Sequence, residues 1–341
     1  MTFSAVHLSR PGVALPPDRL DNAQVLGRIR ENYRGDPTLW PMIEAGVGLV
    51  FEKCNSQYRH IESDQTIDPA DYAVRAAKAC MEENGVAAAD LDLVIYGGIA
   101  RVYFEPATAM EVAAKLGVKE IHAFDVTSAC VGQMEALHIA SAYLGMYPHM
   151  STALVCAGEL TRGFLAYDIQ SPEELLTKAA GLTIGNAGTA WLVRREPFEG
   201  GCARLVAMDN YSLPEHWGLC QAPIDGTFTS KSRELFALNV HVPPALRRVI
   251  EGYGWTPDDV DHYVFHQPSE HMVKKVLNGL EVDLAKGILT HHLFGNTSST
   301  TVALTMHQLL KEDRVRPGDK VCLASAAAGF SLVSALGEWI G

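Results

Sequence analysis

The chain has 341 residues, of which 48% are hydrophobic and 20% charged, and its formal net charge is −12. This composition is typical of a soluble globular protein and excludes a mainly disordered chain. The negative charge argues against a general nucleic-acid binder, because nothing basic would offset repulsion by phosphates. No apolar run approaches the roughly 20 residues of a membrane span, and the first residues lack a signal-peptide pattern. We therefore expect a cytoplasmic protein with no membrane partner.

The seven cysteines are odd in number, widely spaced and mostly in apolar stretches. This pattern indicates reduced thiols and not a disulfide framework. No pair of residues stands at the spacing of zinc ligands, so the sequence predicts no metal site. The length allows two domains of ordinary size, or one large domain made of two similar halves.

The first sixty residues are irregular, with turn signals around short helical stretches, and are expected to form a surface layer. From residue 70 the sequence alternates between amphipathic helices and apolar strands. Helices are predicted at 71–85, 107–117 and 130–145, and strands at 91–99, 121–129, 151–159 and 183–195. This alternation predicts an α/β layered fold.

The second half of the chain repeats this plan. Helices are predicted at 244–254, 270–280 and 295–310, a strand at 261–267, and a strand pair at 320–339. In each half, a helix that opens with small polar residues precedes an apolar strand that ends in small residues. Two related halves would bring these helix starts together at the centre, although two unrelated α/β segments can share such a pattern by chance.

Cys130, in the stretch DVTSAC, lies where a predicted strand gives way to a predicted helix. A helix start offers free N–H groups and a partial positive charge, which lower a thiol pKa. The same N–H groups can hold the oxyanion formed when a thioester carbonyl is attacked. The alternative is a buried structural cysteine. That interpretation is applied to four other cysteines: Cys80, Cys156, Cys202 and Cys322.

His266 and Asn296 complete the candidate site. His266, in VFHQPS, lies where an apolar strand enters a loop, so its ring can project into a cleft. Asn296, in FGNTSSTTVAL, lies at the predicted start of a buried helix, where a simple N-cap is the alternative. Each residue alone is weak evidence for chemistry.

Together, the three segments resemble the ketoacyl synthase III family, condensing enzymes of the thiolase superfamily that start fatty-acid and many polyketide chains. The family's cysteine motif, an aspartate shortly before a small-residue pair and then Cys-x-Gly, resembles DVTSACVGQ. Its His-Gln-x-Asn motif resembles HQPS, and its Gly-Asn-Thr-Ser motif is matched by GNTSS. The order of the motifs and their spacing agree with the family. Weaker similarity extends the resemblance over residues 60–341.

The resemblance implies a thiolase-like α/β fold of five layers, α-β-α-β-α, built from two similar halves at residues 1–194 and 195–341. It also implies a homodimer and a ping-pong mechanism. Cys130 takes an acyl group from a primer thioester, and His266 and Asn296 bind the carbonyl of a malonyl-type thioester. Loss of CO₂ then leaves an enolate that attacks the acyl-cysteine. The substrates would be coenzyme A or acyl carrier protein thioesters, and no permanently bound cofactor is required.

The oxyanion donors implied by the resemblance are the backbone N–H groups of Cys130 and Ala328. In the family the second donor belongs to a glycine-rich turn, which here reads ASAAAGFSLV. Ala327 replaces a glycine in this turn, and its Cβ restricts the backbone.

The family's clamp for the adenine of coenzyme A, an arginine and a tryptophan, is altered in this chain. By rough alignment, Lys53 stands near the arginine and Leu49 near the tryptophan, so aromatic stacking would be lost. Either Trp40 or Arg59 substitutes for the clamp, or the acyl donor is a carrier protein.

The family's primer pocket is closed by an apolar side chain from the partner subunit, and the matching stretch is VYFEPATAM. Phe104 keeps an aromatic side chain there, but Glu105 stands near a position that is usually apolar. A charge in a closed apolar pocket is costly unless it is paired. Either Glu105 faces the pocket and the acyl group is polar, or it points to solvent. Arg162 is a further candidate for the pocket rim.

Basic side chains near the expected entrance could hold a phosphopantetheine arm or an acidic carrier protein. The alternative is a solvated helix face. The candidates are Arg247, Arg248, Lys274 and Lys275.

Two other functions remain open. One is acyl transfer from Cys130 to a hydroxyl or amine of a small acceptor, although relatives of that kind often alter the histidine-asparagine pair. The other is a non-catalytic subunit that only shapes a partner's pocket, which would have little reason to keep Cys130, His266 and Asn296 together.

Overall fold

Ten strands form one mixed sheet in the computed structural model, which describes residues 6–223 and 227–341. These strands are β1 (Val6–Leu8), β2 (Gly12–Ala14), β5 (Leu93–Tyr96), β6 (His122–Asp125), β7 (Thr152–Glu159), β8 (Ala187–Arg194), β9 (Cys202–Ser212), β12 (His262–Phe265), β13 (Lys320–Ala327) and β14 (Ser331–Ile340). Nine follow the order β12-β13-β14-β9-β1-β8-β7-β5-β6, and β2 pairs with β8.

Strand directions repeat between the two sides of this sheet. On one side β5 runs parallel to β7, which is antiparallel to β8. On the other side β12 runs parallel to β13, which is antiparallel to β14. The short strand β1 joins the sides, because it pairs antiparallel with both β8 and β9. We propose that the two halves, 1–194 and 195–341, meet in the turn between β8 and β9.

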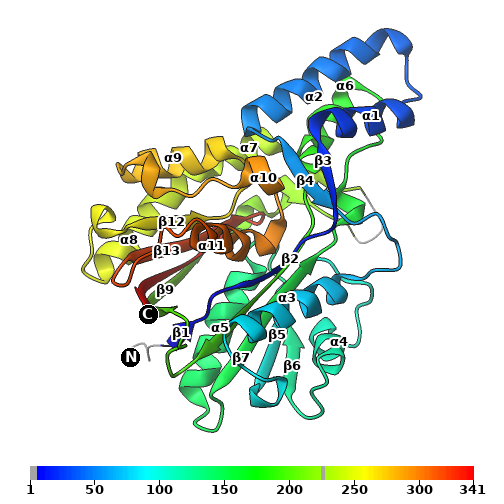
Figure 1. Ribbon diagram of the computed structural model, residues 1–341. Coiled ribbons are helices and arrows are strands. Elements are labelled where there is room, and N and C mark those ends of the chain that lie inside the picture. Colours follow the sequence, from blue (N-terminus) through cyan, green and yellow to red (C-terminus); the bar gives the residue numbers. More distant parts are fainter. Residues whose placement is uncertain (1–5, 224–226) are drawn as a thin grey trace.

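Two helices lie between the two sides of the sheet and form the middle layer. They are α5 (Gly132–Met146) and α11 (Thr301–Lys311), which start on the same side of the molecule. Leu137 of α5 and Met306 of α11 belong to one buried cluster that also takes Val155 from β7 and Leu323 from β13. The core therefore forms around the inner faces of both half-sheets (Figure 1).

The outer faces of the sheet carry two further helix layers. Because side chains alternate along a strand, the neighbours of the inward-facing residues point outward. On the first half, Leu154 packs against α3 (Pro69–Glu83) and α4 (Thr108–Lys115). On the second half, Cys322 packs with α8 (Val242–Gly252) and α9 (Glu270–Leu280). The resulting order is α-β-α-β-α, which confirms the predicted fold class.

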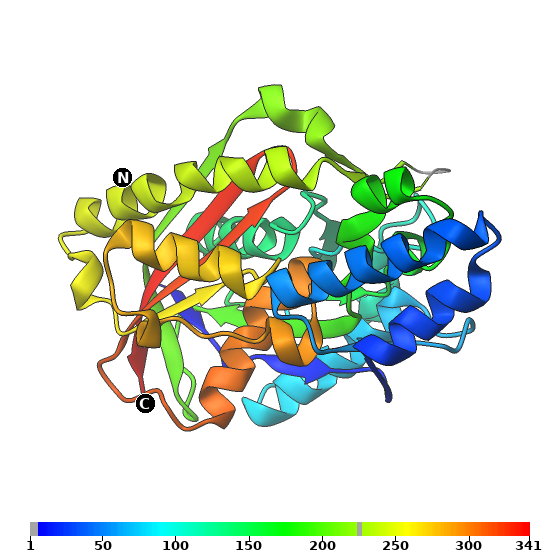
Figure 2. The same cartoon turned by 90° about the horizontal axis from the view of Figure 1, so that it is seen from above.

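A separate cap covers one end of the sheet. Its helices are α1 (Asn22–Asn32), α2 (Trp40–Cys54) and α6 (Pro172–Lys178). An antiparallel pair of strands, β3 (Asp18–Asp21) and β4 (Tyr58–Ile61), connects it to the body. Val25, Ile43, Val47 and Ile169 are fully buried in the cluster that holds the cap together. In Figure 2 the blue helices of the cap lie on the opposite side of the view from the yellow-green start of α8. The expected surface layer is thus present, but α2 is longer than the short helical stretches predicted there.

The remaining elements line the space between the cap and the body. They are β10 (Cys220–Gln221), β11 (Thr229–Ser230), α7 (Ser232–Ala237) and α10 (His291–Phe294). The predicted helix at 295–310 is divided, because a 3₁₀ turn at Ser298–Thr300 precedes α11. Within the described residues, no helix is long and apolar enough to cross a membrane.

Candidate active site

A cavity of ≈ 420 Å³ opens where the cap, the starts of α5 and α11 and the end of β12 converge. Cys130, His266 and Asn296 all line it. The structure thus brings together the three residues that the sequence singles out, although they are separated by up to 166 positions in the chain. Most of the other lining is apolar, and it includes Val50, Ile99, Phe164, Ile184, Phe228, Leu235, Phe236, Met272 and Phe330.

Cys130 occupies a sharp turn between β6 and α5. The preceding residue, Ala129, has a left-handed backbone with φ of 46°, which is rare for a residue with a side chain. Ser325 holds the turn by donating a hydrogen bond from its Oγ to the Cys130 carbonyl at 2.9 Å. A Cβ on Gly132 would lie 2.4 Å from the Gly97 carbonyl oxygen. The glycine of the Cys-x-Gly motif is therefore required by the close approach of two backbones.

The electrostatic setting of Cys130 differs from the expectation. Burial raises the pKa of its thiol to about 12, and the nearby Glu159 and Cys220 act in the same direction. Ser298 opposes this effect by donating a hydrogen bond from Oγ to Cys130 Sγ at 3.6 Å. The predicted lowering of the thiol pKa by the helix start is therefore wrong, since desolvation outweighs it. Cys130 is a neutral thiol before substrate binds.

His266 follows directly after β12. Its backbone N–H donates to the Ala324 carbonyl at 2.9 Å, which continues the pairing of β12 with β13 and fixes the residue at the cavity. Burial, with a contribution from His291, lowers the pKa of His266 to about 3. The imidazole is therefore neutral at physiological pH. Within the described structure, its Nδ1 is buried without a hydrogen-bond partner.

Asn296 is anchored by its backbone and oriented by a neighbour. Its N–H donates to the Thr183 carbonyl at 2.8 Å, and its carbonyl accepts from the Gly185 N–H at 3.0 Å. The Ser298 N–H donates to Asn296 Oδ1 at 2.9 Å. With Oδ1 occupied, the side-chain N–H groups are left to donate to a ligand. Asn296 does not occupy an N-cap position, because the N-cap residues of the 3₁₀ turn and of α11 are Thr297 and Thr300.

Glu159 and Ser299 link the two halves next to the reacting groups, and neither was among the predicted site residues. Glu159, at the end of β7, is fully buried and accepts hydrogen bonds from the Ile99 N–H at 3.0 Å and the Ala100 N–H at 3.2 Å. Ser299 Oγ donates to the same carboxylate. Burial raises the pKa of Glu159 against these hydrogen bonds. A glutamate that ends a wholly apolar strand was the available signal.

Ala327 and Ala328 are the residues of interest in the expected oxyanion turn. Ala328 lines the cavity, as its proposed role requires. Ala327 ends β13, pairs with Ser331 and has no left-handed φ. The restriction expected from its Cβ therefore does not matter here, because the extended conformation suits alanine as well as glycine.

Of the remaining substrate-binding candidates, only Lys53 lines the cavity. Phe104 is 72% exposed and Glu105 is also exposed, and neither lines the cavity of its own chain. The expectation for Arg162 is wrong, because its guanidinium donates to the carbonyls of Asp64 at 2.6 Å and Ile67 at 2.7 Å. Arg162 fixes a loop and does not form the pocket rim.

The proposed replacements for the coenzyme A clamp are also engaged elsewhere. Arg59 is fully buried and donates to Asn22 Oδ1 at 2.9 Å and to Ser56 Oγ at 3.1 Å. Trp40 packs inside the cap, with the Arg30 guanidinium 4.6 Å from its ring centre. Neither side chain lines the cavity, so the idea that one of them replaces the clamp is wrong.

None of the four basic carrier candidates lines the cavity. Arg248 pairs with Asp209 at 2.6 Å, and Arg247 pairs with Glu281 at 3.4 Å. Lys274 pairs with Glu270 at 3.6 Å, and Lys275 is exposed. These contacts are those of solvated helix faces, and a role in carrier binding stays a prediction.

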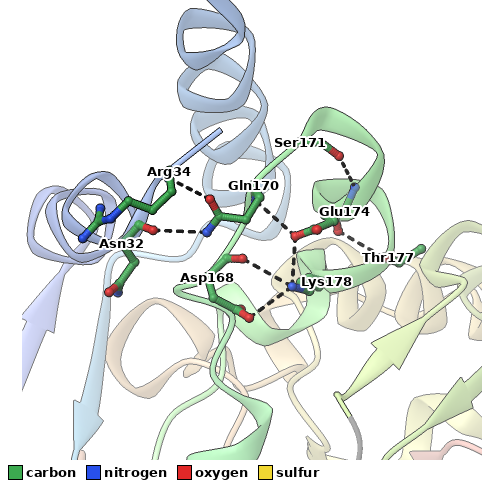
Figure 3. A network of polar contacts seen from close by, with 8 residues as sticks. All are labelled: Asn32, Arg34, Asp168, Gln170, Ser171, Glu174, Thr177 and Lys178. Atoms are coloured by element: carbon green, nitrogen blue, oxygen red, sulfur yellow. Dashed lines mark hydrogen bonds and ion pairs between the residues drawn. The ribbon is translucent and has the colours of Figure 1, made fainter. Parts of the chain in front are cut away.

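A polar network fixes the part of the cap that leads to the cavity (Figure 3). Gln170 donates to the Asn32 carbonyl at 3.1 Å and accepts from the Arg34 N–H at 2.8 Å, which ties α6 to the end of α1. Lys178 pairs with Glu174 at 3.0 Å and with Asp168 at 3.2 Å. Burial opposes protonation of Lys178, but these two bonds outweigh it and raise its pKa. The next two residues, Ala179 and Ala180, line the cavity.

Comparison with known proteins finds similarity over most of the chain. Residues 250–339, which include His266 and Asn296, match the family described as 3-oxoacyl-[acyl-carrier-protein] synthase III C terminal. The chain is 27% identical over 307 residues to the beta-ketoacyl-[acyl-carrier-protein] synthase III of Rhodospirillum centenum, covering 87% of this chain and 92% of the relative. The chain is thus similar over most of its length to proteins of the synthase III family. The beta-ketoacyl-[acyl-carrier-protein] synthase III of Aquifex aeolicus is 26% identical to this chain, and the match covers 80% of this chain and 84% of the relative.

Solved structures show the same similarity at the level of the fold. The synthase III of Aquifex aeolicus has a TM-score of 0.84 at 22% identity and covers 98% of this chain and 99% of its own. Xanthomonas campestris OleA has a TM-score of 0.88 at 22% identity, covering 99% of this chain and 98% of its own. The protein therefore shares the thiolase-like fold of these proteins, and the comparisons together support an acyl-condensing enzyme.

Proposed function

We propose that this protein loads an acyl group onto Cys130 and condenses it with a malonyl-type thioester by decarboxylation. The observation that carries the proposal is that a thiol, a neutral imidazole and an oriented carboxamide line one largely apolar cavity. Neutral donors in a dry site stabilise developing negative charge more strongly than they would in water. The thiol supplies the nucleophile for the loading step, and the imidazole and the amide supply hydrogen-bond donors for the condensing step.

In the loading step, the sulfur of Cys130 attacks the carbonyl carbon of the donor thioester. A new carbon–sulfur bond forms, the bond to the donor sulfur breaks, and the thiol proton of Cys130 ends on the departing thiol. The backbone N–H groups of Cys130 and Ala328 are the proposed donors to the oxyanion. No net charge is created, which suits a thiol whose pKa is raised by burial to about 12.

In the condensing step, His266 and the Asn296 amide donate hydrogen bonds to the thioester carbonyl of the extender. The extender's C–C bond to the carboxylate breaks, CO₂ leaves, and the electron pair is held as an enolate against those two donors. The enolate carbon then attacks the acyl-cysteine and expels the Cys130 thiolate, which recovers a proton. A neutral His266 is the form that this role requires, because an imidazolium would need a costly buried charge.

The substrates we propose are an apolar acyl thioester and a malonyl-type thioester of coenzyme A or a carrier protein. Phe164, Phe236 and Met272 in the lining favour an apolar acyl chain. Xanthomonas campestris OleA has been solved with lauric acid and lauroyl-CoA bound. Lys53 is the proposed contact for the donor phosphates. We further propose a cytoplasmic homodimer without a permanently bound cofactor, in which the exposed Phe104 and Glu105 approach the partner's cavity.

Acylation of the intact protein tests the loading step. The protein is incubated with acyl-CoAs of increasing chain length, and its intact mass is recorded by mass spectrometry. We expect one acyl adduct, located on Cys130 by peptide mapping and lost in Cys130→Ala. Cys54 and Cys220 line the same cavity, so Cys54→Ala and Cys220→Ala are matched controls that should keep the adduct. If no donor acylates Cys130, the proposed function fails.

A second measurement separates condensation from the other functions. Malonyl-CoA or malonyl-carrier protein is added to the acylated protein, and CO₂ release and the β-keto product are followed. Transfer of the acyl group to an added hydroxyl or amine without CO₂ would identify the enzyme as an acyltransferase of that kind. A protein that neither loads nor condenses would fit the non-catalytic subunit.

A further inference from the structure

Ser298 contacts both the nucleophile and the carboxamide of the site, and its side-chain hydroxyl has no role in the function proposed above. Its backbone N–H donates to Asn296 Oδ1 at 2.9 Å, and its side-chain Oγ donates to Cys130 Sγ at 3.6 Å. The residue lines the cavity but is only 4% exposed. One residue of the second half thus contacts both reacting groups, including the sulfur of the first half.

The backbone of Ser298 makes serine a costly choice at this position. Its φ is 56°, in the left-handed region where glycine is the least strained residue. Its other backbone bonds do not need a hydroxyl, because its carbonyl accepts from Thr301 Oγ1 at 2.9 Å. Within the described structure, Cys130 Sγ is the hydrogen-bond partner recorded for Ser298 Oγ. Strained non-glycine residues persist where the side chain is used.

The surroundings of Cys130 explain why a hydroxyl there is useful. The titratable groups that act on the sulfur are Glu159 from β7 and Cys220 from β10. His266, Lys53 and Cys54 line the same cavity. Glu159 and Cys220 disfavour a thiolate when charged, and His266 is neutral. No lysine or arginine other than Lys53 appears in the described lining of the cavity. A neutral donor is therefore the means by which this site can stabilise negative charge on sulfur.

We propose that Ser298 is a catalytic residue that donates its hydroxyl hydrogen bond to the Cys130 sulfur whenever that sulfur carries negative charge. This inference rests on the proposed function, because that function is what puts negative charge on the sulfur. The choice of Ser298 rests on its hydrogen bond to Cys130 Sγ. In loading, the bond strengthens as the S–H proton leaves and the new carbon–sulfur bond forms. In condensation, it strengthens again as the carbon–sulfur bond of the acyl-cysteine breaks and the thiolate departs.

Alkylation of Cys130 by iodoacetamide tests this inference without any acyl substrate. Two variants are used: Ser298→Gly, which removes the hydroxyl and relieves the left-handed backbone, and Ser298→Ala, which removes the hydroxyl alone. A hydrogen bond to a charged group predicts a Cys130 alkylation rate about 10- to 100-fold slower in both variants at pH 8. The pH profile of the rate should move to higher pH by a corresponding amount. Peptide mass spectrometry follows each cysteine separately.

Cys54 and Cys220 serve as internal controls in the same samples, because both line the cavity and, within the described structure, neither has a hydrogen bond to Ser298. Their alkylation rates should not change. A Cys130 rate in both variants that equals or exceeds that of the native protein would overturn the inference, and so would equal slowing of all three thiols, which would indicate a structural effect. If acyl-CoAs fail to load Cys130 while the variants slow its alkylation, the proposed function fails and the role of Ser298 as a donor to the sulfur stands.

Discussion

The two helices of the middle layer begin in different ways, although both point their starts at one cavity. Before α5, a single left-handed residue, Ala129, turns the chain and presents Cys130 directly. Before α11, a 3₁₀ turn intervenes, and the left-handed residue is Ser298. Asn296 lies before that turn, in a bridge with Ile184 of the first half. The first start delivers a nucleophile, and the second delivers hydrogen-bond donors.

The difference between the two helix starts shows how similar halves can supply different reacting groups. A small change at a helix start is enough to present a thiol in one half and hydrogen-bond donors in the other. Cys130 lies two residues before α5, and the second half contacts it through Ser325 Oγ at its carbonyl and Ser298 Oγ at its sulfur. A carboxamide placed before an extra turn is held by contacts with both halves, including Thr183 and Gly185. Both starts therefore depend on contacts between the two halves, and they differ in what they present to the cavity, a thiol at the first and a carboxamide at the second. Four predictions test this division of roles.

The largest expected effect is that of Asn296→Ala on condensation. Removing one donor to a developing oxyanion should slow CO₂ release by about 100- to 1000-fold. Loading of Cys130 should change only a few-fold, because the nucleophile belongs to the other helix start. The rates are measured separately by CO₂ capture and intact-protein mass spectrometry. Asn239→Ala is the matched control, since Asn239 also lines the cavity, and full condensation by Asn296→Ala would contradict the assigned role.

Glu159→Gln tests the link between the two starts. In the glutamine, an NH₂ takes the place of one carboxylate oxygen and can no longer accept a hydrogen bond. It would face the N–H groups of Ile99 and Ala100 or the hydroxyl of Ser299, and these buried donors would be left unpaired. We expect the free energy of unfolding to fall by about 3 kcal/mol, measured by chemical denaturation at pH 7. Glu135→Gln removes the same charge from a half-buried position in α5 and should cost much less. Equal losses in the two variants would refute a special role for Glu159.

Two neutral histidines beside the second start predict sensitivity to acid. Burial lowers the pKa of His266 to about 3 and of His291 to about 4, well below the usual 6.5. Between these values and pH 6.5 the unfolded chain binds more protons than the native one, so stability falls as the pH falls. Each histidine should cost about 2 kcal/mol between pH 8 and pH 5.

The histidine prediction is checked by denaturation at both pH values. His291→Gln should reduce the loss between them by about 2 kcal/mol, because it removes one titrating group and keeps a donor for the Gln267 carbonyl, which His291 Nδ1 contacts at 2.8 Å. His271→Gln, at an exposed position, should leave the loss unchanged. An unaltered loss in His291→Gln would show that this histidine already titrates normally.

The smallest effect is expected from Ala327→Gly, which restores the family's usual residue. Because Ala327 is extended and paired in β13, glycine should lower the free energy of unfolding by about 0.5–1 kcal/mol and leave condensation within a few-fold. Ala335→Gly, in the facing strand β14, is the control for the general cost of glycine in a strand. A tenfold gain in condensation rate would mean that the Cβ of Ala327 does constrain the oxyanion turn.

Much of the architecture could be predicted from the sequence, because strongly periodic segments fold as their patterns indicate. The helices α3, α5, α8 and α9 lie within three residues of the predicted bounds at each end. The cap was harder, because α2 contains the exposed apolar residues Met42 and Leu49, which blur its amphipathic pattern. The 3₁₀ turn before α11 depends on Asn296 bonding to Thr183, a long-range contact that no local pattern reveals.

The site residues that belong to sequence motifs were predicted. The features of the site that depend on tertiary contacts were missed. Cys130, His266 and Asn296 followed from three motifs, but the state of the thiol did not, because its desolvation depends on everything packed around it. Ser298 stood inside a quoted motif, yet its contact with sulfur requires two segments 168 residues apart. Arg162 resembled a pocket residue in sequence, whereas the carbonyls that hold it lie almost a hundred residues earlier.

The three-residue strand β1 has a consequence for protein engineering. On one edge, β1 pairs with β9 through Val6, His7 and Leu8. On the other edge it pairs with β8 through His7 and Leu8, so this strand is the seam that joins the two half-sheets. A break in the turn at 196–201 would separate a fragment with the thiol from a fragment with the imidazole and carboxamide. Neither piece alone holds the full set of reacting groups. Product formed after mixing would therefore report on reassembly across the seam, which makes this chain a candidate scaffold for a split-enzyme sensor.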